Sequence, residues 1–157
     1  MTSSPAGSSG RPSWAALALF LVVGGIAGLG GFTFMYAGGT GYLLDDPTTC
    51  ANCHVMHDVF DSWNRSPHHA VAVCNDCHTP HTFPEKYIIK GLNGINHSTR
   101  FTLGDYPANI RITDLNASVV QANCIYCHAD TINNVVTIGN PHGEDVRCAR
   151  CHADVGH

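Results

Sequence analysis

The chain has 157 residues, a formal net charge of -4 and only 13% charged side chains. A surface that binds nucleic-acid phosphates needs an excess of Lys and Arg, so this low and acidic charge excludes a nucleic-acid-binding protein.

The N-terminal part predicts a membrane anchor. Residues 1–13 form a tail rich in Ser, Gly and Pro that cannot bury enough apolar surface to order itself. Residues 14–36 are 23 uncharged residues, and at ~1.5 Å per residue a helix of this length crosses the ~30 Å hydrocarbon core of a bilayer. A cleaved secretory signal is the alternative, but its apolar part usually has about 7 to 15 residues. We therefore predict one uncleaved transmembrane helix.

The charges beside this helix predict its orientation. Arg11 and the terminal amine precede it, whereas Asp45 and Asp46 follow it. This pattern favours an N-terminus on the cytoplasmic side of the membrane. The chain after about Leu44 then lies on the periplasmic side. Residues 45–157 then form one domain with few large apolar side chains, which needs something else at its centre.

The cysteines predict what lies at that centre. All eight occur in four C-x-x-C pairs, and a histidine follows each pair directly. This is the attachment pattern of c-type haem, in which two thioethers hold the porphyrin and the next histidine binds the iron. Zinc ligation does not require a histidine at that place every time, and a disulfide framework leaves the histidines unexplained. The four motifs are Cys50, Cys53 and His54; Cys74, Cys77 and His78; Cys124, Cys127 and His128; and Cys148, Cys151 and His152.

The spacing of the motifs predicts two paired-haem modules. Their first cysteines are 24, 50 and 24 residues apart. A Pro-His pair also recurs, because His68 and His142 each lie six residues before the first cysteine of the second motif in their module. This duplication indicates modules at about 45–100 and 115–157 and a shared task for the two histidines.

That task is to bind the second axial position of the iron. An electron-transfer haem usually fills this position with histidine or methionine. Seven histidines lie outside the motifs, and we expect about three of them to be such ligands: the candidates are His57, His68, His69, His81, His97, His142 and His157.

Taken together, the motifs resemble the NapC/NirT type of membrane-anchored tetrahaem quinol dehydrogenases, over nearly the whole chain from the anchor to His157. The resemblance implies a mainly α fold with much irregular structure, in which one N-terminal transmembrane helix precedes a small multihaem cytochrome c domain. The stretches that carry it are Asp45-Asp46-Pro47, Cys50-Ala-Asn-Cys53-His54-Val55-Met56, Ser66-Pro67-His68-His69-Ala70, Cys74-Asn-Asp-Cys77-His78-Thr79-Pro80-His81 and Cys151-His152-Ala-Asp-Val-Gly-His157.

The resemblance also implies axial ligands. At the first haem it favours Met56, with His54 displaced from the iron, and we rank His54 second and His57 third. Methionine raises the potential of a haem relative to two histidines. For the other haems the proximal ligands implied are His78, His128 and His152. The distal set implied is His69, His142 and His157, although the internal repeat favours His68 over His69.

Residues 84–97 predict a helix that carries a quinol site. Pro84 suits a helix start, and apolar residues recur at roughly helical spacing. Lys86, Lys90 and His97 fall near one face, which is either an ordinary solvated surface or a quinol pocket. A quinol site needs a donor to the ring oxygen and a base. By resemblance Lys90 is the donor, and we assign the base to His97, which could instead approach the first haem.

The resulting interpretation is a menaquinol-oxidising electron-transfer subunit. It passes electrons through four covalently bound c-type haems to the catalytic subunit of cytochrome c nitrite reductase, which converts nitrite to ammonia. A general tetrahaem donor to nitrate reductase or other periplasmic reductases is the alternative. We expect no nitrite-reducing site in this chain, because the resembling catalytic subunits use an attachment motif that ends in lysine.

Overall fold

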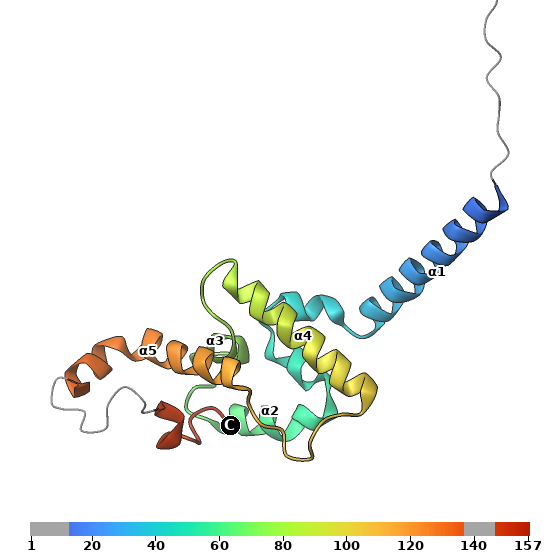
Figure 1. The fold of residues 1–157 in the computed structure, drawn as a ribbon. Coiled ribbons are helices and arrows are strands. Elements are labelled where there is room, and N and C mark those ends of the chain that lie inside the picture. Colours follow the sequence, from blue (N-terminus) through green and yellow to red (C-terminus); the bar gives the residue numbers. More distant parts are fainter. Residues whose placement is uncertain (1–12, 137–146) are drawn as a thin grey trace, which may run out of the picture. The chain divides into compact units, whose positions relative to one another are not determined.

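The computed structural model describes residues 13–136 and 147–157 and divides the chain into two compact units, Met1–Gly39 and Thr40–His157. The described residues are mainly helical, and none of them forms a strand (Figure 1). This confirms the predicted fold class. Apart from Ser13, the predicted disordered tail lies outside the described residues, and so does His142.

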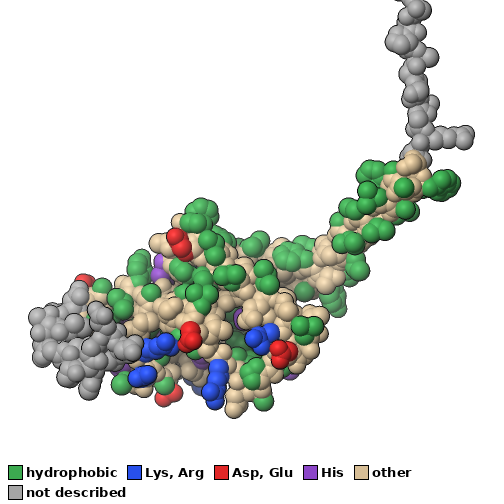
Figure 2. Space-filling model, in the orientation of Figure 1, with side chains coloured by type: hydrophobic (Ala, Val, Ile, Leu, Met, Phe, Trp, Pro, Cys, Tyr) green, Lys and Arg blue, Asp and Glu red, His purple; other side chains and the backbone are tan. Residues whose placement is uncertain are grey.

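The first unit consists of one described helix, α1 (Trp14–Tyr36). Ser13 caps its start, because the Ser13 Oγ accepts a hydrogen bond from the Ala16 amide at 3.1 Å. Gly38 follows its end with a φ of 66°, a left-handed conformation that costs glycine little because it has no Cβ. Hydrophobic side chains cover α1 (Figure 2), and its most apolar stretch has a mean hydropathy of 2.2. Length and composition therefore suit a membrane-crossing helix.

The second unit is a series of mostly short helical segments, and each of the four motifs lies on or beside one of them. The first motif spans η2 and η3, the second lies on α3, the third on α5 and the fourth begins with η5. The segments are η1 (Gly39–Leu43), η2 (Pro47–Asn52), η3 (His54–Met56), α2 (His57–Arg65), α3 (Cys74–His78), α4 (Glu85–Leu103), α5 (Asp114–Val136) and η5 (Cys148–Arg150).

The two long helices of this unit have local features that bear on the site. The helix predicted at residues 84–97 is α4, which starts after Pro84 and continues to Gly104, where a φ of 66° ends it. Helix α5 is not regular, because His128 has non-helical angles of φ -108° and ψ 17°. The chain therefore bends at the histidine that completes the third motif.

The apolar core of the second unit is very small. Among the described residues, only Trp63 and Ile89 are buried hydrophobic side chains, with 9% and 7% of their surface exposed. A domain of this length ordinarily buries many more apolar side chains. The apolar side chains of the described residues therefore supply only a small part of a usual core.

Polar side chains join the segments that carry the motifs. Asn123 on α5 is buried and donates hydrogen bonds to the carbonyl oxygens of Cys77 and Thr79, both at 2.9 Å. Gln121, also on α5, accepts a hydrogen bond from the Cys148 amide at 2.9 Å. Helix α5 therefore connects the second, third and fourth motifs.

Candidate haem and quinol sites

The first motif lies on a short helical turn whose start is capped by a side chain. Asp46 accepts hydrogen bonds from the amide and the hydroxyl of Thr48, at 2.9 and 2.7 Å, and Pro47 supplies the first position of η2. Cys50 lies on η2, and Cys53 ends it. The motif cysteines are therefore presented on a tight 3-10 turn rather than on a regular helix.

Three side chains compete for the iron at this motif, and their surroundings differ. Met56 is half-buried, whereas His54 and His57 are exposed. The Nε2 of His57 lies 3.0 Å from the carbonyl oxygen of Ala51, so this nitrogen is engaged with the backbone. This backbone contact makes His57 the least available of the three, which agrees with its third place in the predicted ranking. The ligand itself stays a prediction.

Two histidine pairs have the separation that one iron requires. The rings of His68 and His128 have centroids 6.0 Å apart, and those of His78 and His157 have centroids 5.8 Å apart. Metal–imidazole bonds are about 2 Å long, so imidazoles on opposite faces of one iron hold their centroids roughly 6 Å apart. Each pair contains one motif histidine and one histidine from outside the motifs. The separation of the rings is therefore compatible with bis-histidine haem at the second and third motifs, and these axial ligands stay a prediction.

One member of these pairs is also oriented by the backbone. The Nδ1 of His68 lies 2.8 Å from the carbonyl oxygen of Val155. A metal-bound histidine usually donates its other ring N–H to such an acceptor, which fixes the tautomer. In this arrangement Nδ1 carries the proton and Nε2 is free for iron. His69 instead packs its ring edge-on against Trp63, with centroids 4.7 Å apart.

The geometry thus favours His68, the residue that the internal repeat indicates, over His69. It also places His157 beside His78 rather than beside His152, its near neighbour in the sequence. The companion of His152 stays a prediction, because His142 lies outside the described residues. The remaining candidate, His81, stacks on Tyr126 with centroids 4.4 Å apart.

The two cysteines differ in exposure in three of the four motifs. All eight cysteines are free thiols, and the first of each pair is half-buried. The second is exposed in three motifs, at Cys53, Cys127 and Cys151, whereas Cys77 is half-buried. A porphyrin attached through both sulfurs would cover these exposed positions. Free thiols are what haem attachment requires. The attachment role of Cys127 and of the other motif cysteines stays a prediction.

The motif cysteines also lie close to one another in pairs. The Cys74 thiol donates a hydrogen bond to Cys50, which lowers the pKa of Cys50 to about 7 and raises that of Cys74. In the second pair, burial and then the nearby Cys148 thiol raise the pKa of Cys124. After haem attachment these sulfurs become thioethers. Burial and then the nearby Cys124 thiol likewise raise the pKa of Cys77, so neighbouring cysteines also link the second and third motifs, and the two paired-haem modules stay a prediction.

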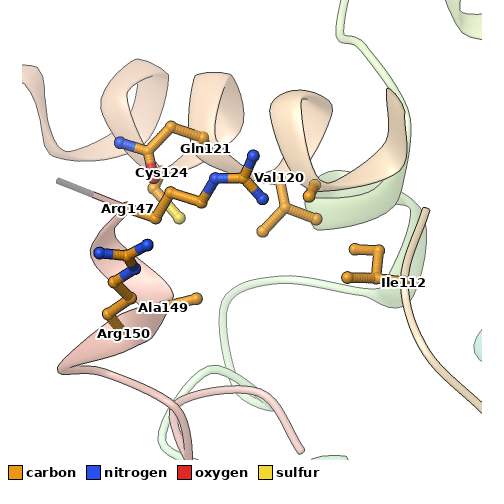
Figure 3. A pocket seen from close by; sticks show the side chains of 8 residues that line it. Ile112, Val120, Gln121, Cys124, Arg147, Ala149 and Arg150 are labelled. Carbon is orange, nitrogen blue, oxygen red and sulfur yellow. The ribbon is translucent and has the colours of Figure 1, made fainter. Parts of the chain in front are cut away.

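A cavity lies beside the third and fourth motifs. Its volume is about 390 Å³, within the range of roughly 300 to 1,000 Å³ that cofactor sites occupy. Figure 3 shows Val120 and Cys124 of α5 facing Arg147 and Arg150 across it. The attachment sulfur, the apolar wall and two cationic side chains suit a porphyrin that carries carboxylates.

A charged cluster lies where α4 meets the segment before η2. The Asp45 carboxylate accepts hydrogen bonds from Lys86 at 2.6 Å, Lys90 at 2.9 Å and Asn75 at 3.0 Å. These bonds, that from Lys86 foremost, lower the pKa of Asp45 to about 2. Lys90 also donates to the Leu44 carbonyl oxygen at 2.7 Å. The predicted quinol-site lysine is therefore held firmly.

The structure brings the two lysines together but leaves His97 outside the cluster. His97 is exposed on α4, seven residues after Lys90, which is about 10 Å along a helix axis. Two contacts were not predicted from the sequence: Asp45 with Lys90, and Asn75 with Asp45. The contacts of Asp45 with Asn75 and Lys90 join residues that are 30 and 45 positions apart, and helical periodicity gives no signal for them.

Comparison with known proteins agrees with the motifs. A model of the NapC/NirT cytochrome c family, N-terminal region, matches residues 9–157. The cytochrome c-type protein NrfH of Wolinella succinogenes is 39% identical over 125 residues, covering 74% of this chain and 71% of that protein. The cytochrome c nitrite reductase subunit NrfH of Nitratidesulfovibrio vulgaris is 32% identical over 114 residues, covering 72% and 68%. These matches confirm the resemblance predicted from the motifs.

A solved structure is similar in fold as well as in sequence. It is a chain in the crystal structure of the cytochrome c nitrite reductase NrfHA complex bound to the HQNO inhibitor. The similarity has a TM-score of 0.62 and 32% identity, and it covers 86% of this chain and 88% of that chain. The similarity in fold therefore extends over most of both chains.

Proposed function

The chain belongs to the NapC/NirT cytochrome c family, and from this premise we propose that it is the menaquinol-oxidising subunit of a cytochrome c nitrite reductase. Its covalently bound c-type haems number four. It passes electrons through them to a catalytic multihaem subunit, which reduces nitrite to ammonia. The haem domain lies on the periplasmic side of the cytoplasmic membrane, and this chain has no nitrite-reducing site of its own.

The arrangement of the haem-binding residues carries this proposal. Four complete attachment motifs occur in one small domain, and two histidine pairs with centroids about 6 Å apart suit six-coordinate iron. The first and second motifs are adjacent through Cys50 and Cys74, and Asn123 joins the second motif to the third. When bound, haem supplies one-electron oxidation and reduction. A continuous series of such sites suits electron transfer better than hydrolysis or ligand storage.

The quinol site lies at the Lys90 cluster. Oxidation of menaquinol to menaquinone releases two electrons and two protons, so its site needs a hydrogen-bond donor and a proton acceptor. The Lys90 ammonium is the donor to a ring oxygen. Asp45 stays a carboxylate because its pKa is about 2, so it is a poor proton acceptor. We assign proton acceptance to the exposed His97, whose imidazole accepts one proton at a time and passes each to solvent.

The partner follows from the relatives. Both curated relatives are called NrfH, one of them as a subunit of cytochrome c nitrite reductase, and the similar solved chain is part of the NrfHA complex. This favours nitrite reductase over the general donor to nitrate reductase or other periplasmic reductases. The two alternatives differ in the docking surface and not in the haems or the quinol site.

The test is to purify the tagged chain from its native membrane in mild detergent and to assay nitrite reduction under anaerobic conditions. A menaquinol analogue is the electron donor. We expect activity, a co-purifying larger multihaem subunit and inhibition by HQNO. Haems that the quinol reduces without nitrite consumption would favour the general donor. Haems that the quinol leaves oxidised would contradict quinol oxidation altogether.

A further inference from the structure

The chain has only two lysines, and both bind the same carboxylate. Lys86 Nζ lies 2.6 Å from Asp45 Oδ2, and Lys90 Nζ lies 2.9 Å from Asp45 Oδ1. The lysines are four residues apart on α4, so one helical turn separates them. Asp45 is therefore the point at which the cationic face of α4 joins the chain that leads into the first haem motif.

Lys90 has three N–H donors, and the structure uses two of them well. One bonds to Asp45 Oδ1 at 2.9 Å and another to the Leu44 carbonyl oxygen at 2.7 Å. The next nearest acceptor, the Leu43 carbonyl oxygen, is 3.5 Å away, which makes a weak bond at best. The third N–H of Lys90 therefore has only this long contact, which an acceptor from outside the chain could replace.

The surroundings of Lys90 restrict its movement. Only 10% of its side chain is exposed, although lysine is ordinarily one of the most exposed residues. Its Nζ also lies 5.8 Å from the centre of the Tyr87 ring, at the limit of a cation–π contact. A long side chain with four rotatable bonds is thus held in one place before any ligand arrives, which reduces the entropy lost on binding.

Asn75 connects this arrangement to the second haem motif. It lies between Cys74 and Cys77, and its Nδ2 donates to Asp45 Oδ1 at 3.0 Å. Asp45 Oδ1 therefore accepts from the quinol-site lysine and from an attachment motif at once. The position of the Lys90 ammonium is fixed relative to the residues that hold haem.

We propose that Asp45 is a positioning residue of the quinol site, which holds the Lys90 ammonium so that its remaining N–H meets the ring oxygen of the quinol. This rests on the proposed quinol oxidation. Asp45 does not itself touch the quinol or accept its protons. Lys86 supports Asp45 by binding its other oxygen.

The test compares Asp45→Asn with Asp46→Asn in the detergent-purified holoprotein and its partner. Asp46 is the matched control, because it is the next residue and the substitution removes the same charge. Asp46 contacts Thr48 rather than a lysine, and an Asn side chain can cap the turn as Asp does. We expect Asp45→Asn to raise the KM for the menaquinol analogue about tenfold, since a charge-assisted hydrogen bond is lost. Asp45→Glu should restore part of this loss, and Asp46→Asn should behave as the native protein.

Electrons supplied by reduced viologen enter without the quinol site and provide the second readout. Nitrite reduction driven by viologen should be equal in the native protein and in Asp45→Asn. Equal losses with both donors would show a merely structural role and overturn the proposal. An unchanged KM for the quinol in Asp45→Asn would also overturn the positioning role of Asp45. The proposed quinol oxidation would still stand in that case, provided that the native protein oxidises the quinol.

Labelling of the two lysines tests the hold on Lys90 without any quinol. The holoprotein is treated briefly with an amine-reactive reagent, and modification at each lysine is measured by peptide mass spectrometry. Lys90 should be labelled several times faster in Asp45→Asn than in the native protein or in Asp46→Asn. Equal labelling of Lys90 in all three proteins would show that Asp45 does not hold it.

Discussion

His68 and His69 are neighbours in the chain, but their rings have different surroundings. The ring of His68 faces the motif histidine His128 and bonds through Nδ1 to a backbone carbonyl. The ring of His69 packs against Trp63, one of the two buried hydrophobic residues among those described. At the residue scale, therefore, the surroundings favour His68 over His69 as an iron ligand, and this assignment stays a prediction.

This difference predicts unequal effects of two matched substitutions. His68→Ala should leave one iron without its second axial histidine, which converts one haem from low spin to high spin. His69→Ala should keep the number of low-spin haems unchanged and lower the thermal stability. Electron paramagnetic resonance of the oxidised protein counts the low-spin signals, and haem absorption on heating measures the stability. Loss of a low-spin signal in His69→Ala but not in His68→Ala would reverse the assignment.

At the scale of elements, α5 organises the second unit through two amide side chains. Asn123 donates to the second motif, and Gln121 accepts from the fourth while the helix itself carries the third. Buried carbonyl groups without a hydrogen-bond partner are costly, so the helix and the motifs depend on each other. Helix α5 therefore acts as the common support for three haem-binding motifs.

We expect Asn123→Leu to destabilise the domain by about 2 kcal/mol, because it leaves the Cys77 and Thr79 carbonyl oxygens without their donor in a buried place. The control is Asn64→Leu on α2, where the side chain is exposed. Denaturant unfolding of the holoprotein, followed through the haem absorption, gives the difference between the two variants. Equal stability of both variants would show that these two hydrogen bonds contribute little.

The sequence predicted some elements fully and others in part, for local reasons. Haem attachment requires contiguous residues, so all four motifs could be found, and the uncharged run at residues 14–36 has the bounds of α1. The helix predicted at residues 84–97 is longer in the structure and ends only at Gly104. The pairs His68–His128 and His78–His157 join residues 60 and 79 positions apart, and no local pattern specifies such contacts.

At the scale of the whole chain, the two units serve different environments. The first unit has an apolar surface that suits lipid, and the second is a domain whose described residues include only two buried hydrophobic side chains. Apolar burial is the main favourable term in folding, and here the chain supplies little of it. We infer that haem supplies the rest, so that attachment and folding of the second unit are coupled.

The haem-free chain should therefore fail to fold beyond its anchor. A variant with all eight motif cysteines replaced by serine cannot attach haem, and we expect its second unit to be cleaved rapidly by trypsin after Lys86 and Lys90. In the holoprotein Lys90 is protected, since only 10% of its side chain is exposed and its hydrogen bonds hold it. Limited proteolysis in detergent, with the fragments identified by mass spectrometry, measures the difference.

The anchor offers a control within the same chain, because residues 14–36 contain neither Lys nor Arg and should survive as one fragment in both proteins. Equal protection of Lys90 without haem would show that the chain folds by its own side chains, and the small apolar core would then need another explanation.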